Sequence, residues 1–320
     1  MKRFKKILFL SNPKEKQNAA IRRAVSLAKQ NDATVTVLSV LKSSAYALHV
    51  PLPDAELDAL QEELVHAHQI AAREVADGFR QKGIDVHVKV LVGIAFVEVI
   101  REVLREQHDL VILAADSKKG LINRLFGSIS THLMRKCPCP VWVVKPGSGK
   151  TYRRILAAVD IFSDPFDEAG ESINSLILQL SSSLARMDNS DLHVIQVWNI
   201  ENEGHLGAPG FMDGKALRRL RDETRNDLGQ RLEHLMQEID RDGIGTVRTH
   251  LERGDDPAES IVELTQKQEV DLLVMGTVCR TGLSGFLIGN TAEEVLGAVD
   301  CSVLTVKPEG FVSPVTLDDR

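Results

Sequence analysis

The sequence contains an internal repeat of about 160 residues, present in two copies. Residues 108–146 align without a gap with residues 270–308, and about eleven of the 39 aligned positions are identical. The offset between the two copies grows from 148 to 162 along the chain, as a duplication with loop insertions would produce. A period of this size is a whole domain, far longer than the roughly 20–50 residues of a solenoid repeat. The repeat therefore predicts two domains of one fold, residues 1–149 and 150–310, and a tail, residues 311–320.

Each unit contains five short runs rich in apolar and β-branched residues, which is typical of β-strands. The runs lie at about 7–11, 34–40, 85–91, 109–114 and 141–144 in the first unit, and at about 154–159, 192–198, 246–251, 271–276 and 302–306 in the second. Charged segments with apolar residues at helical spacing separate them, so strands and helices alternate. The pattern predicts a doubly wound α/β domain in each half: a five-stranded parallel sheet with helices on both faces. Such sheets bind ligands beyond the carboxyl ends of the strands, where the strand order reverses.

Composition excludes several classes of protein. Hydrophobic residues make up 43% of the chain, yet no apolar run reaches the roughly 20 residues of a membrane span. The apolar stretch Ile7–Leu10 is also shorter than a signal-peptide core of about 7–15 residues, so we expect a cytoplasmic protein with no membrane partner. No dense basic cluster with interleaved aromatic residues is present, so we expect no nucleic-acid partner.

The two halves carry opposite charge. Residues 1–150 have a formal charge of +8 (23 Lys and Arg against 15 Asp and Glu), and residues 151–320 have −14 (16 against 30). Opposite charge would draw the halves together if they pack, although surface drift between two domains explains it equally well. The long segments 55–81 and 215–241 are open to two interpretations, a lid over a pocket or an interdomain face.

Four cysteines are too few for a disulfide scaffold. Cys137 and Cys139 form a CPCP string, but no second Cys or His pair stands at zinc-ligand spacing, so we expect no metal site. Cys139 and Cys301 occupy one repeated position before an apolar strand, where Cys behaves as a small buried hydrophobe. We therefore predict that Cys137, Cys139 and Cys301 are structural.

Two segments resemble phosphate-binding loops. Gly147–Thr151 contains the Gly-Lys-Thr sequence of a P-loop. A P-loop also needs a glycine five residues before Gly149, where this chain has Val144, and a helix after the loop, where this chain has a predicted strand. This segment is interpreted as the linker between the domains. In the second segment, 276–296, a strand ends at Gly276, and Gly289-Asn290-Thr291 begins a helix whose free N–H groups could bind an anion. A capped helix with turn glycines accounts for the same residues as well.

This second segment, GTVCRTGLSGFLIGNTAEEVL, and the repeat around it resemble the universal stress protein family in its tandem form. The family's nucleotide motif is G-x2-G-x9-G-S/T, and the resemblance covers about residues 3–308. It implies flavodoxin-like or Rossmann-like domains that are usually dimeric, some of which bind ATP. It further implies an intramolecular pseudo-dimer in which the last strands, Val141–Val144 and Val303–Val306, lie near each other.

The resemblance assigns a pocket to the second domain. Asp160 corresponds to the acid that contacts ribose or adenine, and Val197 to the residue whose backbone reads adenine. The remaining positions would hold ribose and phosphates: Gly276, Gly289, Asn290 and Thr291. Cys279 stands where the motif has its second glycine, and Asn290 replaces its serine.

The first domain departs further from the motif. Its counterparts are Asn12 for the acid, Val40 for the adenine-facing valine, Ala114 and Ser117 for two glycines, and Gly127 with Ser128 for the final pair. The resemblance therefore favours the second domain for ATP or AMP, with Mg²⁺ only as a companion of ATP.

The function indicated is a non-enzymatic stress-response protein that holds a nucleotide and acts through client proteins, with a homodimer as a further partner state. One alternative is a weak ATP hydrolase or nucleotide transferase, which the absent P-loop lysine and the lack of a catalytic dyad disfavour. Another is a scaffold that binds an apolar ligand without nucleotide.

Overall fold

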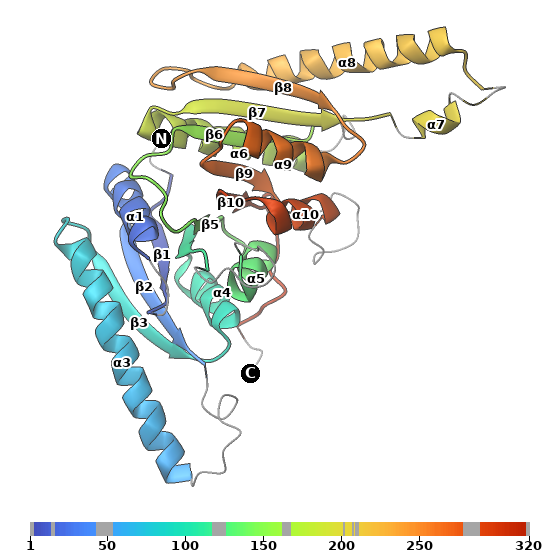
Figure 1. Cartoon of the computed structure of the whole chain (residues 1–320). Coiled ribbons are helices and arrows are strands. Elements are labelled where there is room, and N and C mark those ends of the chain that lie inside the picture. The colour runs from blue at the N-terminus through green and yellow to red at the C-terminus, as the bar shows by residue number, and fades with distance from the viewer. Residues whose placement is uncertain are drawn as a thin grey trace.

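The computed structural model joins both halves in one ten-stranded sheet with the order β3-β2-β1-β4-β5-β10-β9-β6-β7-β8 (Figure 1). The structure describes residues 3–13, 17–42, 54–116, 126–161, 168–200, 202–206, 208, 211–277 and 289–317. The elements of the first half are β1 (Lys6–Ser11), α1 (Asn18–Asn31), β2 (Thr34–Leu41), α3 (Asp54–Arg80), β3 (Val86–Val92), α4 (Ala95–Glu106), β4 (Leu110–Ala114), α5 (Ser128–Lys136) and β5 (Val141–Val144). Those of the second half are β6 (Arg154–Ala158), α6 (Glu168–Asp188), β7 (Asp191–Trp198), α7 (Glu203–Leu206), α8 (Gly214–Met236), β8 (Val247–Arg253), α9 (Pro257–Lys267), β9 (Leu272–Gly276), α10 (Asn290–Ala298) and β10 (Ser302–Val306).

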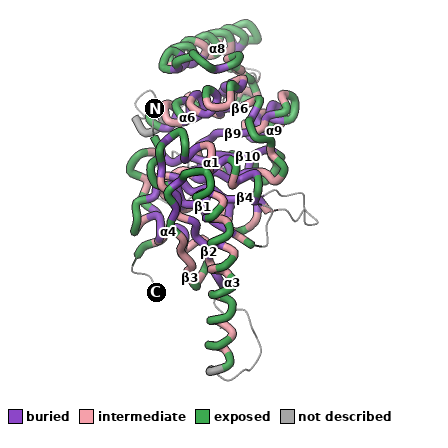
Figure 2. Tube along the Cα trace, turned by 90° about the vertical axis from the view of Figure 1, so that its left-hand side faces the viewer, coloured by how far each residue is buried: buried purple, intermediate pink, exposed green. Residues whose placement is uncertain are grey.

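The predicted fold class is confirmed. Five strands lie in each half in the same spatial order, and every pair within a half is parallel. Helices α1, α3, α6 and α8 cover one face of the sheet, and α4, α5, α9 and α10 cover the other. The central strands are buried on both faces, as their nearly unbroken apolar sequences indicate (Figure 2).

The two long helices lie at the outer ends of the sheet rather than at its centre. Helix α3 packs on β2 and β3 through Ala72, Ala76 and Phe79, which are buried and recur at three- to four-residue spacing. Its first turns extend beyond the sheet (Figures 1 and 2). Helix α8 packs on β8, so neither helix forms the face between the halves. No helix in the described ranges has the length and apolar character to cross a membrane.

The halves meet through the last strand of each. Strands β5 and β10 pair antiparallel, with Leu304 opposite Trp142 and Val303 opposite Val143. Trp142 is 1% exposed, and its ring lies 6.0 Å from that of Tyr152, so this tryptophan packs in the core. Both hydrophobic clusters, one on each face of the sheet, contain residues of both halves. The connection from β5 leads directly into strand β6, so Gly147–Thr151 precedes no helix and is a linker.

Ion pairs between the halves follow the charge difference seen in the sequence. Lys145 Nζ lies 3.0 Å from Asp300 Oδ2, Arg135 pairs with Glu293, and Arg23 pairs with Asp188. In all three, the cation belongs to the first half and the acid to the second. The Lys145 and Arg135 pairs are partly exposed and stabilise the junction only slightly, but the Arg23 pair is buried.

The Arg23–Asp188 pair breaks the symmetry of the two halves. Arg23 Nη1 lies 2.5 Å from Asp188 Oδ2, and its guanidinium stacks 3.4 Å from the centre of the Tyr152 ring. The same Asp188 oxygen accepts the N–H of Tyr152 at 2.8 Å. At the equivalent place in the first half, Asn31 accepts the N–H of Phe4 at 3.1 Å with a neutral side chain. The sequence alignment places Leu180 where the first half has Arg23.

We therefore expect Arg23→Leu to lower the free energy of unfolding by about 3–5 kcal/mol, because Asp188 is left as an unpaired buried carboxylate. Adding Asp188→Asn should restore most of that loss, since asparagine still accepts the Tyr152 N–H as Asn31 accepts that of Phe4. Urea denaturation of the single and double variants measures both steps. A double variant no more stable than Arg23→Leu would contradict the symmetry argument.

Candidate functional site

The strand order reverses between β6 and β9 in the second half. The chain leaves β6 toward β7 on one side and leaves β9 toward β10 on the other, so the ligand crevice expected of a doubly wound sheet would lie beyond the carboxyl ends of these two neighbours. Asp160 follows β6, and Gly276 ends β9. Two of the residues predicted from the sequence therefore lie on adjacent strands at this edge.

Asp160 is held at the edge by its backbone. Asn174 of α6 accepts the Asp160 N–H at 3.0 Å and donates to the Asp160 carbonyl at 2.8 Å. Asn174 is 4% exposed, whereas the Asp160 residue as a whole is exposed. The amide side chain thus fixes the chain direction after β6 and leaves Asp160 exposed beyond the carboxyl end of that strand.

Helix α10 begins beside the end of β9. The Gly289 N–H donates to the Thr277 carbonyl at 3.2 Å, so Gly289 lies next to the residue that follows β9. Gly289 is the N-cap of α10 and, as a glycine, supplies no side-chain cap to the first turn. The N–H groups of Asn290 and Thr291 precede the first intrahelical bond, which runs from Glu293 to Gly289. The positive end of the helix dipole and the first backbone N–H groups of α10 therefore lie at the carboxyl edge of the sheet, which are the features that suit an anion.

Gly276 and Val197 have structural partners that the sequence did not reveal. A Cβ on Gly276 would come within 2.7 Å of Ile173 Cδ1, so the absence of a side chain lets α6 approach β9. The Val197 carbonyl accepts from Gln196 Nε2 at 2.6 Å, and Gln196 Oε1 accepts the Ile161 N–H at 2.7 Å. An adenine that forms hydrogen bonds with the Val197 backbone would have to share the Val197 carbonyl with the Gln196 side chain or displace that side chain. Cys279 lies outside the described residues.

A buried lysine joins this edge to the first half. Lys307 follows β10 and is 6% exposed; its ammonium donates to the Met134 carbonyl of α5 at 2.6 Å and contacts the Thr277 hydroxyl. The same hydroxyl donates to the Met134 carbonyl at 3.0 Å. Burial lowers the pKa of Lys307 to about 7. Its counterpart Lys145 is 35% exposed and pairs with Asp300, and Ala115 stands in the first half where Thr277 stands in the second.

This pKa gives a pH dependence of stability with a definite sign. Between about pH 7 and pH 10.5 the unfolded chain holds a proton on Lys307 that the folded chain has released, so folding becomes more favourable as the pH rises. The stability difference between the parent and Lys307→Met should therefore rise from pH 7 to pH 9, by at most about 1.4 kcal/mol per pH unit. Urea denaturation at both pH values measures it. Lys145→Met is the matched control, and an equal slope for both variants would contradict the assignment.

The first half places its candidate residues differently. Asn12 is clamped by Gln17, which accepts the Asn12 N–H at 3.1 Å and donates to its carbonyl at 2.8 Å, so the Asp160–Asn174 arrangement is repeated. Val40 lies in β2 and is half-buried. Ser117 lies outside the described residues, and Ala114 ends β4.

An internal carboxylate occupies the helix start of the first half. A Cβ built on Gly127 would come within 1.5 Å of Asp116 Oδ2, so the Asp116 carboxylate lies against the N-cap of α5, ahead of Ser128. An acid at this place satisfies the positive end of the helix and repels a second anion. The sequence does contain a sign of this difference between the halves. Position 116 is an aspartate, whereas the aligned residue of the second half is Val278.

The cysteines remain a prediction. Cys137 and Cys301 are buried, and burial raises the pKa of Cys301 to about 12. Cys139 is half-buried, with its Sγ 3.6 Å from that of Cys137. Among the described residues, no group of three or more His, Cys, Asp or Glu side chains is arranged to hold a metal ion.

The repeated fold, with the last strand of each half paired, defines a tandem α/β protein with a doubly wound parallel sheet in each half. Residues 3–145 and residues 151–307 each match the universal stress protein family, and the chain belongs to this family.

Full-length relatives have the same tandem form. The chain is 28% identical to universal stress protein E of Escherichia coli K12 over 324 residues, covering 100% of this chain and 99% of the relative. It is 28% identical to a universal stress protein E homolog of Haemophilus influenzae, covering 96% of this chain and 98% of the relative. A crystal structure of a universal stress protein from Pseudomonas aeruginosa UCBPP-PA14 has a TM-score of 0.69 at 25% identity, with 96% of this chain and 95% of that chain covered.

Proposed function

We propose that this universal stress protein binds an adenine nucleotide, ATP or AMP, in the crevice of its second half. The observation that carries the proposal is the hydrogen bond from Gly289 to Thr277, which sets the start of α10, with glycine at its N-cap, beside the end of β9. A nucleotide lying across β6 and β9 would meet Asp160 with its ribose and the α10 N–H groups with its phosphates.

The residues present fit such a ligand in three respects. Asp160 offers a carboxylate at the surface of the crevice, and carboxylates accept hydrogen bonds from ribose hydroxyls. Gly289, Asn290 and Thr291 supply backbone donors and two polar side chains for phosphate. Mg²⁺ would accompany ATP on its phosphates. In the first half, the Asp116 carboxylate lies at the equivalent helix start, which supports binding in the second half alone.

We further propose that the protein holds the nucleotide rather than turning it over rapidly, and that it acts through client proteins in the cytoplasm. Support comes from membership of a family that is generally non-enzymatic. The two halves would work as an intramolecular pseudo-dimer joined at β5 and β10. A second copy of the chain is a further partner in this proposal.

Gly289→Val should abolish nucleotide binding, because a branched side chain at the N-cap crowds the backbone donors that phosphate needs. Cys279→Gly should tighten binding, since it restores the motif glycine and removes a side chain whose crowding could cost about 1–3 kcal/mol. That range corresponds to roughly tenfold to a hundredfold in affinity. Isothermal titration calorimetry with ATP on the parent and both variants measures these effects. Parent-like binding by Gly289→Val would remove the site from this helix.

A matched pair of variants separates the two halves. Asn290 and Ser128 are the exposed first residues of α10 and α5, so each can lose its side-chain donor without disturbing the core. Asn290→Ala should weaken ATP binding by roughly tenfold to a hundredfold, the loss of about one hydrogen bond to a charged group. Ser128→Ala should leave binding unchanged. The reverse result would place the nucleotide in the first half.

Mass spectrometry of the denatured, purified protein tests the ligand class directly. The proposal expects ATP or AMP at up to one molecule per chain. A co-purified lipid without nucleotide would favour an apolar-ligand scaffold, and rapid release of ADP from added ATP would favour a hydrolase.

A further inference from the structure

Strand β3 ends the sheet with an open edge. No strand in the described ranges pairs with it on the side away from β2. The Val35 N–H donates to the Asp85 carbonyl and the Gly93 N–H to the Leu41 carbonyl, so the odd-numbered residues of this segment bond to β2. Because neighbouring residues of a strand point their backbone groups to opposite sides, Val88 and Val90 direct theirs outward. Unpaired backbone groups of this kind are a template for an added strand.

A groove runs along this edge beneath α3. Its volume is about 260 Å³, and it is lined by Gln69, Arg73 and Arg80 of the helix and by Val88 and Val90 of the strand. The two valines thus contribute both their side chains to the groove and their outward backbone groups to the open edge. An extended segment lying on the edge would place every second side chain in the groove.

The groove is basic. Arg80 donates to Asp77 at 2.8 Å and to the Val86 carbonyl at 3.2 Å, which closes the start of the open edge. Arg73 is exposed, and it has no ion-pair or hydrogen-bond partner among the described residues. One arginine is therefore anchored at the strand, and the other, two helical turns earlier, is available to an acidic ligand.

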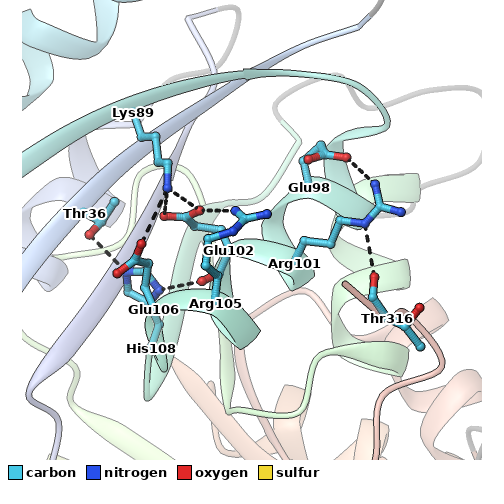
Figure 3. Close-up of polar contacts among 9 residues, drawn as sticks. All are labelled: Thr36, Lys89, Glu98, Arg101, Glu102, Arg105, Glu106, His108 and Thr316. Atoms are coloured by element: carbon cyan, nitrogen blue, oxygen red, sulfur yellow. Dashed lines mark hydrogen bonds and ion pairs between the residues drawn. The ribbon is translucent and has the colours of Figure 1, made fainter. Parts of the chain in front are cut away.

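Lys89, the lysine of β3, does not block the open edge of the strand. Lysine on an edge strand commonly blocks pairing with another chain. Lys89 instead lies on the opposite face, where its ammonium is 2.8 Å from both carboxylate oxygens of Glu102 and 3.7 Å from Glu106 (Figure 3). Arg105 also binds Glu102, and His108 bonds to Thr36 of β2, so this face is tied to α4 (Figure 3). The approach to Val88 and Val90 remains open.

We propose that the edge of β3 binds an extended, acidic segment of a partner protein as an additional strand. Backbone bonds to Val88 and Val90 would supply the register, and a glutamate or aspartate side chain on the α3 face would pair with Arg73. This site lies at the far end of the first half and does not depend on nucleotide binding.

The other end of the sheet differs in the residues that matter. A glycine with positive φ follows each of the two long helices, Gly83 after α3 and Gly243 after α8, and these two glycines align the helices. In this alignment Glu233 of α8 corresponds to Arg73. Asp240, just after α8, corresponds to Arg80. Asp240 pairs with Arg186. The basic groove therefore belongs to the first half alone. Two β3 edges of separate copies would bring like-charged grooves together, which disfavours self-pairing through this strand.

The test uses the full chain and a fluorescein-labelled, blocked heptapeptide of alternating threonine and glutamate. Fluorescence anisotropy should show saturable binding to the parent. Arg73→Glu should weaken it by about tenfold or more, because the variant replaces attraction with repulsion. Arg219→Glu, the same charge change on the exposed face of α8, should leave the affinity unchanged. Thermal unfolding of both variants checks that the fold is retained.

Two ligand controls distinguish strand addition from attraction between charges. A peptide N-methylated at alternate residues keeps its charge but cannot pair through its backbone, so it should bind about tenfold more weakly. A threonine–lysine peptide should not bind. Equal binding of the methylated peptide, or equal weakening by Arg73→Glu and Arg219→Glu, would overturn the proposal. So would self-association of the parent that Arg73→Glu abolishes, because it would assign the groove to the acidic end of a second copy.

Discussion

The antiparallel pairing of β5 with β10 is the contact on which the architecture rests. Each half taken alone would end in a strand with an open edge and a sheet covered by helices only up to that strand. Pairing these edges satisfies the backbone of both strands and lets apolar layers pass across the junction on both faces of the sheet. The halves are consequently one packed body rather than two domains on a tether.

The direction of that pairing decides where each site lies. Because the strands of the two halves run in opposite directions, their carboxyl ends lie at opposite edges of the sheet. The carboxyl edge of the second half therefore meets the C-terminal turn of α5, where the Met134 carbonyl accepts from Thr277 and Lys307. The candidate nucleotide crevice is thus built on its own strands and supported from outside by the other half.

Much of the fold could be predicted from the sequence, since the repeat and the apolar runs specify five strands in each half. The site was less accessible, because motif spacing locates Gly276 and Gly289 but says nothing of the amide groups that shape the crevice. Gln17 and Asn174 align at an offset of 157, whereas the turn residues that they bind, Asn12 and Asp160, align at 148, and neither alignment shows that these side chains bind those turns. The acid at the α5 start and the burial of Lys307 depend on contacts distant in sequence, which local patterns do not carry.

Nine residues connect β5 to β6 and join the two halves covalently. Two separate single-domain chains would join and part as their abundance rose and fell, whereas covalently linked halves remain associated at any dilution. Fusion also frees each side of the junction to change alone, since a symmetric dimer must carry every substitution twice. Arg23 facing Asp188, and Thr277 without a counterpart hydroxyl, are differences that only a fused chain can hold. Each half is thereby free to acquire residues that would serve no purpose in the other.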